Sequence, residues 1–224
     1  MKWGYGWELG PFEVWDAMGV RSTVSRMKNE NKNVPSWVYE MLTSGRETFY
    51  ELANGERTYY DVLSSSVKTI NKDPMVINLN LKKSENSVIK KDWSASLIDL
   101  GDEVLNVEFL SALEATLNPF DSAMGEVISD AIDLLDAGKY KALVLGHQGA
   151  NFCAGANLAN MIQVIDAKEF NKLEKSIQDF QNLMQRIRFS SAPVIAAPHH
   201  LALGGGFELS APAAHRVALS ELYI

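Results

Sequence analysis

The chain has 224 residues, of which 46% are hydrophobic and 22% are charged, a composition that supports a folded core and excludes wholesale disorder. The net charge of −7 argues against a general nucleic-acid or anionic-membrane binder. Cys153 is the only cysteine, which excludes a disulfide framework or a cysteine-based zinc site and favours a reducing, cytoplasmic setting. The sequence has neither a signal-peptide core nor an apolar run of about 18 residues, so we expect neither export nor a membrane span.

The N-terminal part of the chain divides by composition into two segments. Residues 1–28 are rich in tryptophan and glycine, and Pro11 stands where a helix can begin. The early glycines lack the preceding apolar strand and the spacing of a dinucleotide-binding fingerprint, so we interpret them as turn glycines. Residues 29–92 form a more polar connector. In this connector Asn54 and Gly55 separate FYEL from RTYYDVL, which predicts a small β-hairpin.

From residue 93 onward the pattern becomes a compact α/β rhythm. The segment SLIDLGDEVLNVEF predicts two antiparallel strands joined by a tight turn at Gly101 and Asp102. Next, DSAMGEVISDAIDLLDAG has apolar residues at helical spacing and predicts a helix that ends at Gly138. KALVLGHQG and SAPVIAAP then predict two short buried strands, each followed by a loop.

A long helix is predicted over about residues 167–188. Its apolar residues recur at three- and four-residue spacing, which predicts a stripe that faces the core. The stripe consists of Phe170, Leu173, Ile177, Phe180, Leu183, Met184 and Ile187. The final residues ELYI indicate a further strand, and we expect both ends of the chain to be cut from a longer protein.

The two loops after the buried strands, CAGAN at 153–157 and LGGGFE at 203–208, consist largely of small residues. Small residues let a ligand approach the main chain, and a helix that starts in each loop would leave backbone amides free. Two such amides directed at one oxygen would form an oxyanion hole. Alternatively, the small residues only permit tight turns or close packing. A phosphate-binding P-loop is excluded because no GK[ST] follows the glycines.

Glu208 follows the second loop, in the first turn of the expected helix. There a carboxylate has either a structural role beside the helix N-terminus or the chemical role of holding and activating a water molecule. His199 and His200 have no partner residues at metal-ligand spacing, so we expect no metal site and interpret them as structural or rim residues.

These motifs carry a family resemblance. In order and spacing, SLIDLGDEVLNVEF, ALVLGHQGANFCAGANL and PVIAAPHHLALGGGFEL resemble the N-terminal half of a crotonase (enoyl-CoA hydratase/isomerase) domain. The resemblance implies an α/β fold, the N-terminal half of a ββα spiral, for residues 93–224. Residues 1–28 resemble the last helical repeat of a 3-hydroxyacyl-CoA dehydrogenase, and residues 29–92 would connect the two. That order is found in bacterial bifunctional β-oxidation proteins, so we expect an internal piece of such a protein.

The resemblance also implies a role for each site residue. The amides of Ala156 and Gly205 would form the oxyanion hole for the thioester carbonyl of an acyl-CoA. Ala154 would lie against the adenine of CoA, and Gly155 belongs to the loop whose backbone would follow the pantetheine arm. Glu208 would be the first of two catalytic glutamates and would position or deprotonate the water that adds to a trans-2-enoyl-CoA.

Other features leave the subfamily and the activity open. The family's second glutamate would follow Ile224, and Glu221 is not assigned that role. Asn157 occupies the position of the aspartate common in hydratases. Double-bond isomerisation is the alternative reaction, and a catalytically incomplete binding or assembly module is the alternative class; a nucleotide-phosphate protein that uses the three glycines is a third. We expect no cofactor in this piece, NAD only in a separate dehydrogenase domain, and a self-associating homo-oligomer.

Overall fold

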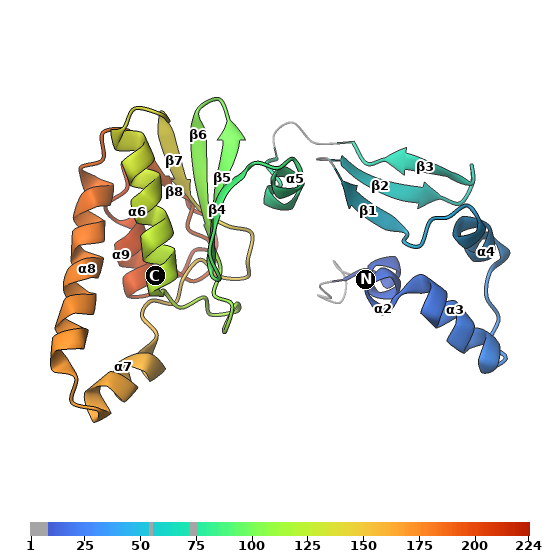
Figure 1. The fold of residues 1–224 in the computed structure, drawn as a ribbon, viewed down its shortest axis with the longest axis horizontal. Helices are drawn as coiled ribbons and strands as arrows, with labels where there is room; N and C mark the ends of the chain where they lie inside the picture. The colour runs from blue at the N-terminus through green and yellow to red at the C-terminus, as the bar shows by residue number, and fades with distance from the viewer. Residues whose placement is uncertain (1–8, 54–55, 72–75) are drawn as a thin grey trace. The chain divides into compact units, whose positions relative to one another are not determined.

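The computed structural model describes residues 9–53, 56–71 and 76–224. It divides the chain into two compact units, Met1–Asn86 and Ser87–Ile224 (Figure 1). The assignment of residues 1–28, 29–92 and 93–224 to a dehydrogenase tail, a connector and a crotonase domain stays a prediction. Among the described residues, no helix is both long and apolar enough to cross a membrane.

The first unit combines short helices with a three-stranded antiparallel sheet of order β1-β2-β3. Pro11 begins the first helix as predicted, and the Gly10 amide donates to Oε2 of Glu13 at 2.7 Å, which caps the helix start. The predicted hairpin is confirmed by the antiparallel pairing of β1 and β2; its turn at Asn54–Gly55 lies outside the described residues. The elements are α2 (Pro11–Met18), α3 (Val20–Asn29), α4 (Ser36–Thr43), β1 (Tyr50–Ala53), β2 (Glu56–Asp61), β3 (Ser66–Thr69) and α5 (Leu79–Ser84).

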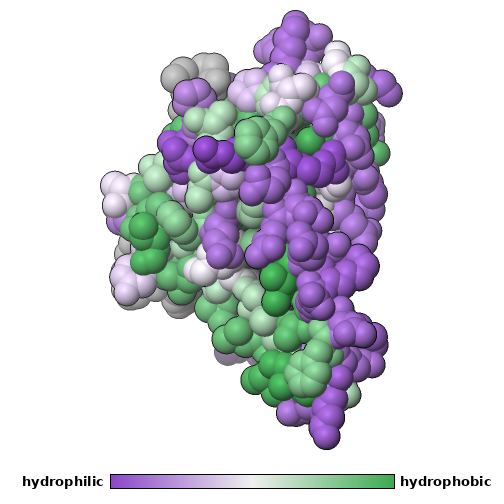
Figure 2. Space-filling model, turned by 90° about the vertical axis from the view of Figure 1, so that its left-hand side faces the viewer, coloured by the Kyte–Doolittle hydropathy of each residue, from purple (hydrophilic) through white to green (hydrophobic). Residues whose placement is uncertain are grey.

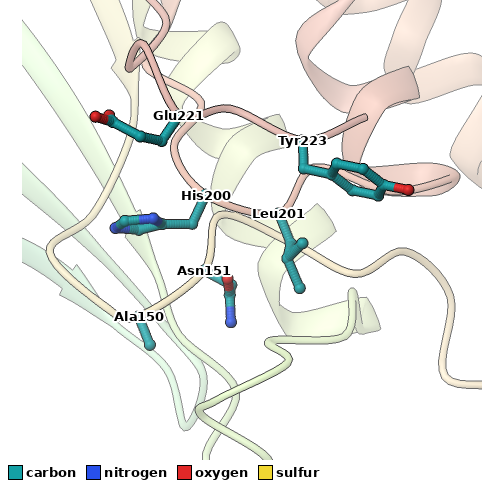
Figure 3. A pocket seen from close by; sticks show the side chains of 6 residues that line it. All are labelled: Ala150, Asn151, His200, Leu201, Glu221 and Tyr223. Carbon is teal, nitrogen blue, oxygen red and sulfur yellow. The ribbon is translucent and has the colours of Figure 1, made fainter.

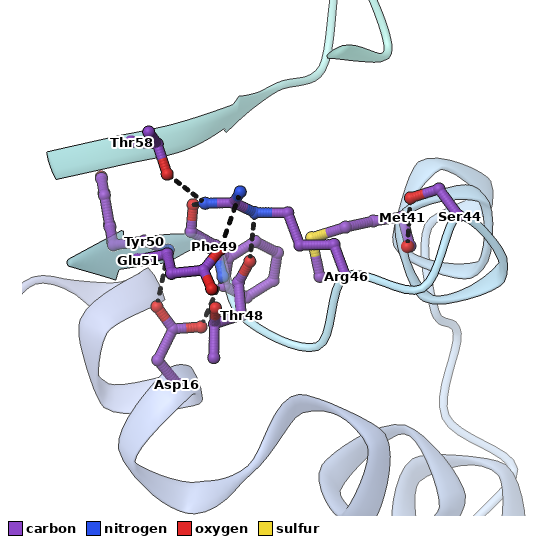
Figure 4. A network of polar contacts seen from close by, with 9 residues as sticks. All are labelled: Asp16, Met41, Ser44, Arg46, Thr48, Phe49, Tyr50, Glu51 and Thr58. Carbon is purple, nitrogen blue, oxygen red and sulfur yellow. Dashed lines mark hydrogen bonds and ion pairs between the residues drawn. The ribbon is translucent and has the colours of Figure 1, made fainter. Parts of the chain in front are cut away.

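Asp16 joins α2 to the sheet of the first unit (Figure 4). Its Oδ1 accepts a hydrogen bond from the Phe49 amide at 2.6 Å, and its Oδ2 accepts one from the Tyr50 amide at 2.9 Å. Trp15 stacks on Phe49 with 5.3 Å between ring centroids. A helix from residues 1–28 and a strand from residues 29–92 therefore share one buried cluster.

The second unit is built on a six-stranded sheet of order β4-β5-β6-β7-β8-β9. The first three strands pair antiparallel, and the strands from β6 to β9 pair parallel. The antiparallel pair β5–β6 confirms the strands predicted on either side of Gly101. The strands are β4 (Val88–Lys91), β5 (Ala95–Gly101), β6 (Val104–Phe109), β7 (Ala142–Leu145), β8 (Val194–Ala196) and β9 (His215–Arg216).

Helices α6 (Ser122–Asp136), α7 (Leu158–Asp166), α8 (Phe170–Arg188) and α9 (Gly205–Ser210) complete this unit. Helix α6 confirms the predicted helix and ends at Asp136, two residues before the predicted Gly138; its N-cap is Asp121, whose Oδ1 accepts the Met124 amide at 3.0 Å. Its buried residues are Ala123, Met124, Val127, Ile128, Ala131, Ile132 and Leu135. Together with inward-facing residues of β5 to β8 they form the core, and this α/β arrangement is the predicted fold class.

The predicted core stripe of α8 is wrong for the N-terminal half of the helix. Leu183 and Ile187 are buried, but Ile177 is 46% exposed and Phe170 is 58% exposed. Figure 2 shows apolar side chains gathered at the lower end of this face, where α7 and the start of α8 lie. Helical periodicity predicts which residues share one face of a helix. Among the described residues, however, no other segment buries this face in the N-terminal half of α8.

The C-terminal residues also depart from the prediction. Instead of a strand over ELYI, only Tyr223 forms an isolated parallel bridge, with Leu201. The last named strand lies earlier, at His215–Arg216.

Candidate functional site

The two small-residue loops lie side by side in the second unit. Cys153 and Ala202 form an isolated parallel bridge. The Cys153 amide donates to Leu201 O at 3.0 Å, and the Leu203 amide donates to Cys153 O at 3.0 Å. Because the parallel strands β7 and β8 precede these loops, both loops leave the same edge of the sheet. The sheet topology therefore brings together two segments that are far apart in sequence.

Each loop leads directly into a helix, and after the first loop this is the short helix α7, which precedes the long helix predicted at 167–188. Asn157 caps α7, since its Oδ1 accepts the Asn160 amide at 3.1 Å. Gly204 precedes α9 with a φ of 49°, a left-handed conformation that glycine adopts without steric cost.

The three consecutive glycines at 204, 205 and 206 differ in whether the structure requires glycine. A Cβ atom at Gly204 would meet no heavy atom within 4 Å, so its positive φ alone favours glycine there. At Gly205 a Cβ atom would make only ordinary contacts, the nearest at 3.5 Å to Gly155 Cα. At Gly206 a Cβ atom would lie 2.1 Å from Cys153 O, so only glycine lets α9 pack this closely against the first loop.

Gly155 provides the matching close approach from the first loop. Its φ is +92°, and a Cβ atom there would lie 2.8 Å from Leu203 O and 3.0 Å from Gly205 N. The Gly155 carbonyl accepts the Phe120 amide at 2.8 Å. The absence of a side chain at Gly155 therefore lets the two loops approach closely, and its positive φ sets the backbone direction just before Ala156.

The amides of Ala156 and Gly205 lie close to each other. A Cβ atom at Gly205 would lie 3.6 Å from Ala156 N. Within the part of the chain that the structure describes, neither amide donates a hydrogen bond to another group. Ala156 is exposed and Gly205 is half-buried. Two unused donors that lie together in an accessible position are available to one acceptor oxygen of a ligand.

The remaining predicted site residues occupy distinct positions around these amides. The Ala154 amide donates to Leu117 O at 2.9 Å, so it is already used. Glu208 is exposed in the first turn of α9, and its own amide donates to Gly204 O at 3.0 Å. Its carboxylate makes no hydrogen bond or ion pair with any described residue. The structure thus places Glu208 in the helix that begins at Gly205.

Sequence reasoning missed the polar group beneath the first loop, which consists of Asn118 and His147. Asn118 is fully buried; its Oδ1 accepts the Ser111 amide at 2.7 Å, and its Nδ2 donates to Phe152 O at 2.8 Å. His147 Nε2 lies 2.9 Å from Phe152 O. The sequence contained a partial signal, since Asn118 directly precedes Pro119 and adopts a φ of 51°, a conformation in which asparagine is enriched.

Burial sets the protonation state of the titratable groups here. It lowers the pKa of His147 from 6.5 to about 4 and raises the pKa of the Cys153 thiol from 9.0 to about 11. His147 is therefore neutral at pH 7, and Cys153 is a protonated core residue that lacks the thiolate needed for nucleophilic chemistry. The ring of His199 meets that of His147 edge to face, with 4.9 Å between centroids, which agrees with its predicted structural role.

A separate cavity of about 440 Å³ opens beside the second loop (Figure 3). The residues that line it are Ala150, Asn151, His200, Leu201, Glu221 and Tyr223. None of the five predicted site residues is among them. His200 thus lies on a rim, as predicted, and this cavity is distinct from the pair of amides at Ala156 and Gly205.

The sheet order and the pairing of the two loops fit the predicted crotonase-type α/β fold. A family model described as enoyl-CoA hydratase/isomerase matches residues 111–223. The chain therefore belongs to the enoyl-CoA hydratase/isomerase family.

Individual proteins extend this similarity to the whole chain. A Bacillus subtilis (strain 168) protein named "Probable 3-hydroxyacyl-CoA dehydrogenase" is 40% identical over 230 residues, which span 100% of this chain but 28% of that protein. A Rickettsia felis protein, provisionally named a fatty acid oxidation complex trifunctional enzyme, is 26% identical over 99% of this chain and 27% of its own length. The crystal structure of a provisionally named enoyl-CoA hydratase from Streptomyces coelicolor A3(2) shares the fold, with a TM-score of 0.52 and 22% identity over 67% of this chain and 52% of that one.

Proposed function

We propose that the second unit binds a 2-enoyl-CoA thioester and serves hydration of its double bond. The observation that carries this proposal is the pair of free amides, Ala156 and Gly205, on two loops that the sheet brings together. Both would donate to the thioester oxygen. Donors aimed at an oxygen that gains negative charge stabilise the transition state, and removal of one such donor costs about 10²–10³ in turnover.

Glu208 is the proposed group that acts on water. Polarisation of the carbonyl draws electrons from the conjugated double bond and makes C3 electrophilic. A water molecule held by the Glu208 carboxylate would add its hydroxyl to C3, and C2 of the resulting enolate would take up a proton, so that one H₂O is added overall. General-base assistance of this kind contributes about 10²–10⁴ in rate. The exposed position of Glu208 and its lack of a polar partner among the described residues support this role.

We further propose that the chain is part of a longer β-oxidation protein. The B. subtilis relative is named as a probable 3-hydroxyacyl-CoA dehydrogenase, and a segment that makes up 28% of its length aligns with the whole of this chain. A dehydrogenase elsewhere in such a protein would use NAD to oxidise the 3-hydroxyacyl-CoA that hydration forms. In this proposal Ala154 and Gly155 belong to the loop that contacts CoA.

The binding test compares two substitutions at one position. Gly205→Pro removes the amide hydrogen at the first residue of α9, where proline is tolerated. Gly205→Ala adds a side-chain carbon but keeps the hydrogen, and its Cβ atom has room. We expect calorimetric titration with crotonyl-CoA to give affinity close to wild type for Gly205→Ala and a loss of at least about tenfold for Gly205→Pro. Equal affinity of the two variants, or no binding by the wild type, would refute the proposal.

The reaction is tested separately through Glu208. Hydration removes the conjugation of crotonyl-CoA and therefore its ultraviolet absorbance, whereas isomerisation of a 3-enoyl-CoA creates such absorbance. We expect Glu208→Gln to bind crotonyl-CoA like the wild type but to lower any hydration rate by about 10²–10⁴. Unchanged turnover in this variant would exclude Glu208 as the water-activating group.

A further inference from the structure

The loop that carries Ala156 is held by a nearly complete set of hydrogen bonds. The Phe152 amide donates to His199 O at 3.1 Å, and the amides of Cys153 and Ala154 donate to Leu201 O and Leu117 O. The carbonyls of Cys153 and Gly155 accept from Leu203 and Phe120. All of these hydrogen bonds form between backbone amide and carbonyl groups. The next amide along the chain is the unused Ala156 N–H.

Phe152 O is the point where side chains hold this loop. Asn118 Nδ2 donates to it at 2.8 Å, and His147 Nε2 lies 2.9 Å away. One carbonyl oxygen has two lone pairs and can accept both bonds. Phe152 and Asn118 are fully buried, and His147 is 8% exposed, so no water competes for this oxygen.

The hydrogen bonds determine the tautomer of His147. The Gly149 amide donates to Nδ1 at 3.0 Å, so Nδ1 is an acceptor and the ring hydrogen is on Nε2. Nε2–H therefore donates to Phe152 O. The two hydrogens of the Asn118 amide go to Phe109 O, at 3.2 Å, and to Phe152 O. The 3.1 Å approach between Asn118 Nδ2 and His147 Nε2 is then a contact between two donors and not a hydrogen bond.

We propose that His147 is a positioning residue for the oxyanion hole. Its neutral Nε2–H, together with the Asn118 amide, fixes the Phe152 carbonyl and through it the direction of the Ala156 amide. This inference rests on the proposed function. A misplacement of about 1 Å in a site of this kind can lower the rate about 10²-fold. Two side-chain donors from outside the loop, Asn118 and His147, would prevent such a misplacement by fixing the Phe152 carbonyl.

Replacements of His147 can separate positioning from stability. Gln places its amide nitrogen where Nε2 lies and can still donate to Phe152 O. Asn is shorter; it reaches only the Nδ1 position, so it can bond to Gly149 but not to Phe152. The matched control is His199→Asn, because the His199 side chain bonds to Gly149 O at 3.1 Å and makes no bond to Phe152 O. Any loss of stability is measured for each variant by thermal unfolding.

The readout is the infrared stretching frequency of the ¹³C-labelled thioester carbonyl of crotonyl-CoA bound to the full chain. Hydrogen bonds to the carbonyl lower this frequency. We expect the wild type, His147→Gln and His199→Asn to share the downward shift, and His147→Asn to lose most of it and to bind crotonyl-CoA about tenfold more weakly. CoA without an acyl group should bind all four proteins alike.

The outcomes separate this inference from the function on which it rests. If the wild type lowers the carbonyl frequency and folded His147→Asn lowers it equally, His147 does not position the hole. If His147→Asn does not fold, His147→Phe replaces it in the same comparison with His147→Gln, and an equal shift in those two variants overturns the inference. If the wild type itself causes no shift, the proposed oxyanion hole is wrong, and the inference is overturned with it.

Discussion

A methyl group added at Gly206 should destabilise the second unit, whereas the same group at Gly205 should not. At Gly206 the new Cβ atom would lie 2.1 Å from Cys153 O, 2.8 Å from Cys153 C and 2.9 Å from Cys153 Cβ. Carbon and oxygen atoms in close contact are about 3.3 Å apart, so the backbones must separate by about 1 Å. Overpacking of this kind typically costs about 1–3 kcal/mol.

At Gly205 the nearest atom to an added Cβ is 3.5 Å away, an ordinary contact. Replacing glycine by alanine in a helix stabilises by roughly 0.5–1 kcal/mol because the unfolded chain loses freedom. Both glycines lie in α9, so this gain applies to both variants and the overpacking cost alone separates them. We therefore expect Gly206→Ala to be less stable than Gly205→Ala by about 1–3 kcal/mol. For a chain of this size that difference corresponds to roughly 2–12 °C in Tm.

Thermal unfolding followed by circular dichroism measures the difference, and hydrogen exchange locates it. The Leu203 amide donates to Cys153 O at 3.0 Å, so its exchange should accelerate in Gly206→Ala and stay slow in Gly205→Ala. Equal Tm values for the two variants, or an unchanged exchange rate at Leu203, would refute the close packing of α9 on the first loop.

Two further predictions concern the buried His147 and the half-buried Asp16. Because the unfolded His147 titrates near 6.5 and the folded one near 4, the unfolded chain takes up a proton first as pH falls. The free energy of unfolding should therefore decrease between these pH values by about 3 kcal/mol, at about 1.4 kcal/mol per pKa unit, as urea denaturation can measure. Asp16→Ala leaves the amides of Phe49 and Tyr50 without their acceptor, which should cost about 1.5–3 kcal/mol and accelerate the hydrogen exchange of both amides.

Each of these predictions has a control and a contrary outcome. His147→Gln cannot titrate, so its decrease in stability should be smaller; a pH profile identical to that of the wild type would contradict the assignment to His147. Glu47→Ala removes an exposed carboxylate that pairs with Arg21, and such surface pairs are worth about 0–1 kcal/mol. If it destabilises the first unit as much as Asp16→Ala does, the two backbone hydrogen bonds are not the cause.

Local pattern was enough to predict most of the secondary structure around the site. Alternation on either side of Gly101 predicted the β5–β6 pair, and helical spacing after Asp121 predicted α6. The spacing of α8 predicted which residues share a face but not what covers it, so Phe170 and Ile177 were wrongly assigned to the core. Periodicity is a property of one segment, whereas burial depends on a second one.

The sequence by itself determined the chemistry that is available: two loops of small residues, a carboxylate after the second, and motifs that resemble one family. Only the tertiary structure decided that the amides of Ala156 and Gly205 lie together without an acceptor among the described residues. It also decided that, of the three consecutive glycines, Gly206 is the one with no room for a side chain. It also revealed His147 beneath the first loop. The physical reason is the same in each case: hydrogen bonds and close contacts between distant segments depend on three-dimensional position, which the parallel pairing of β7 with β8 supplies.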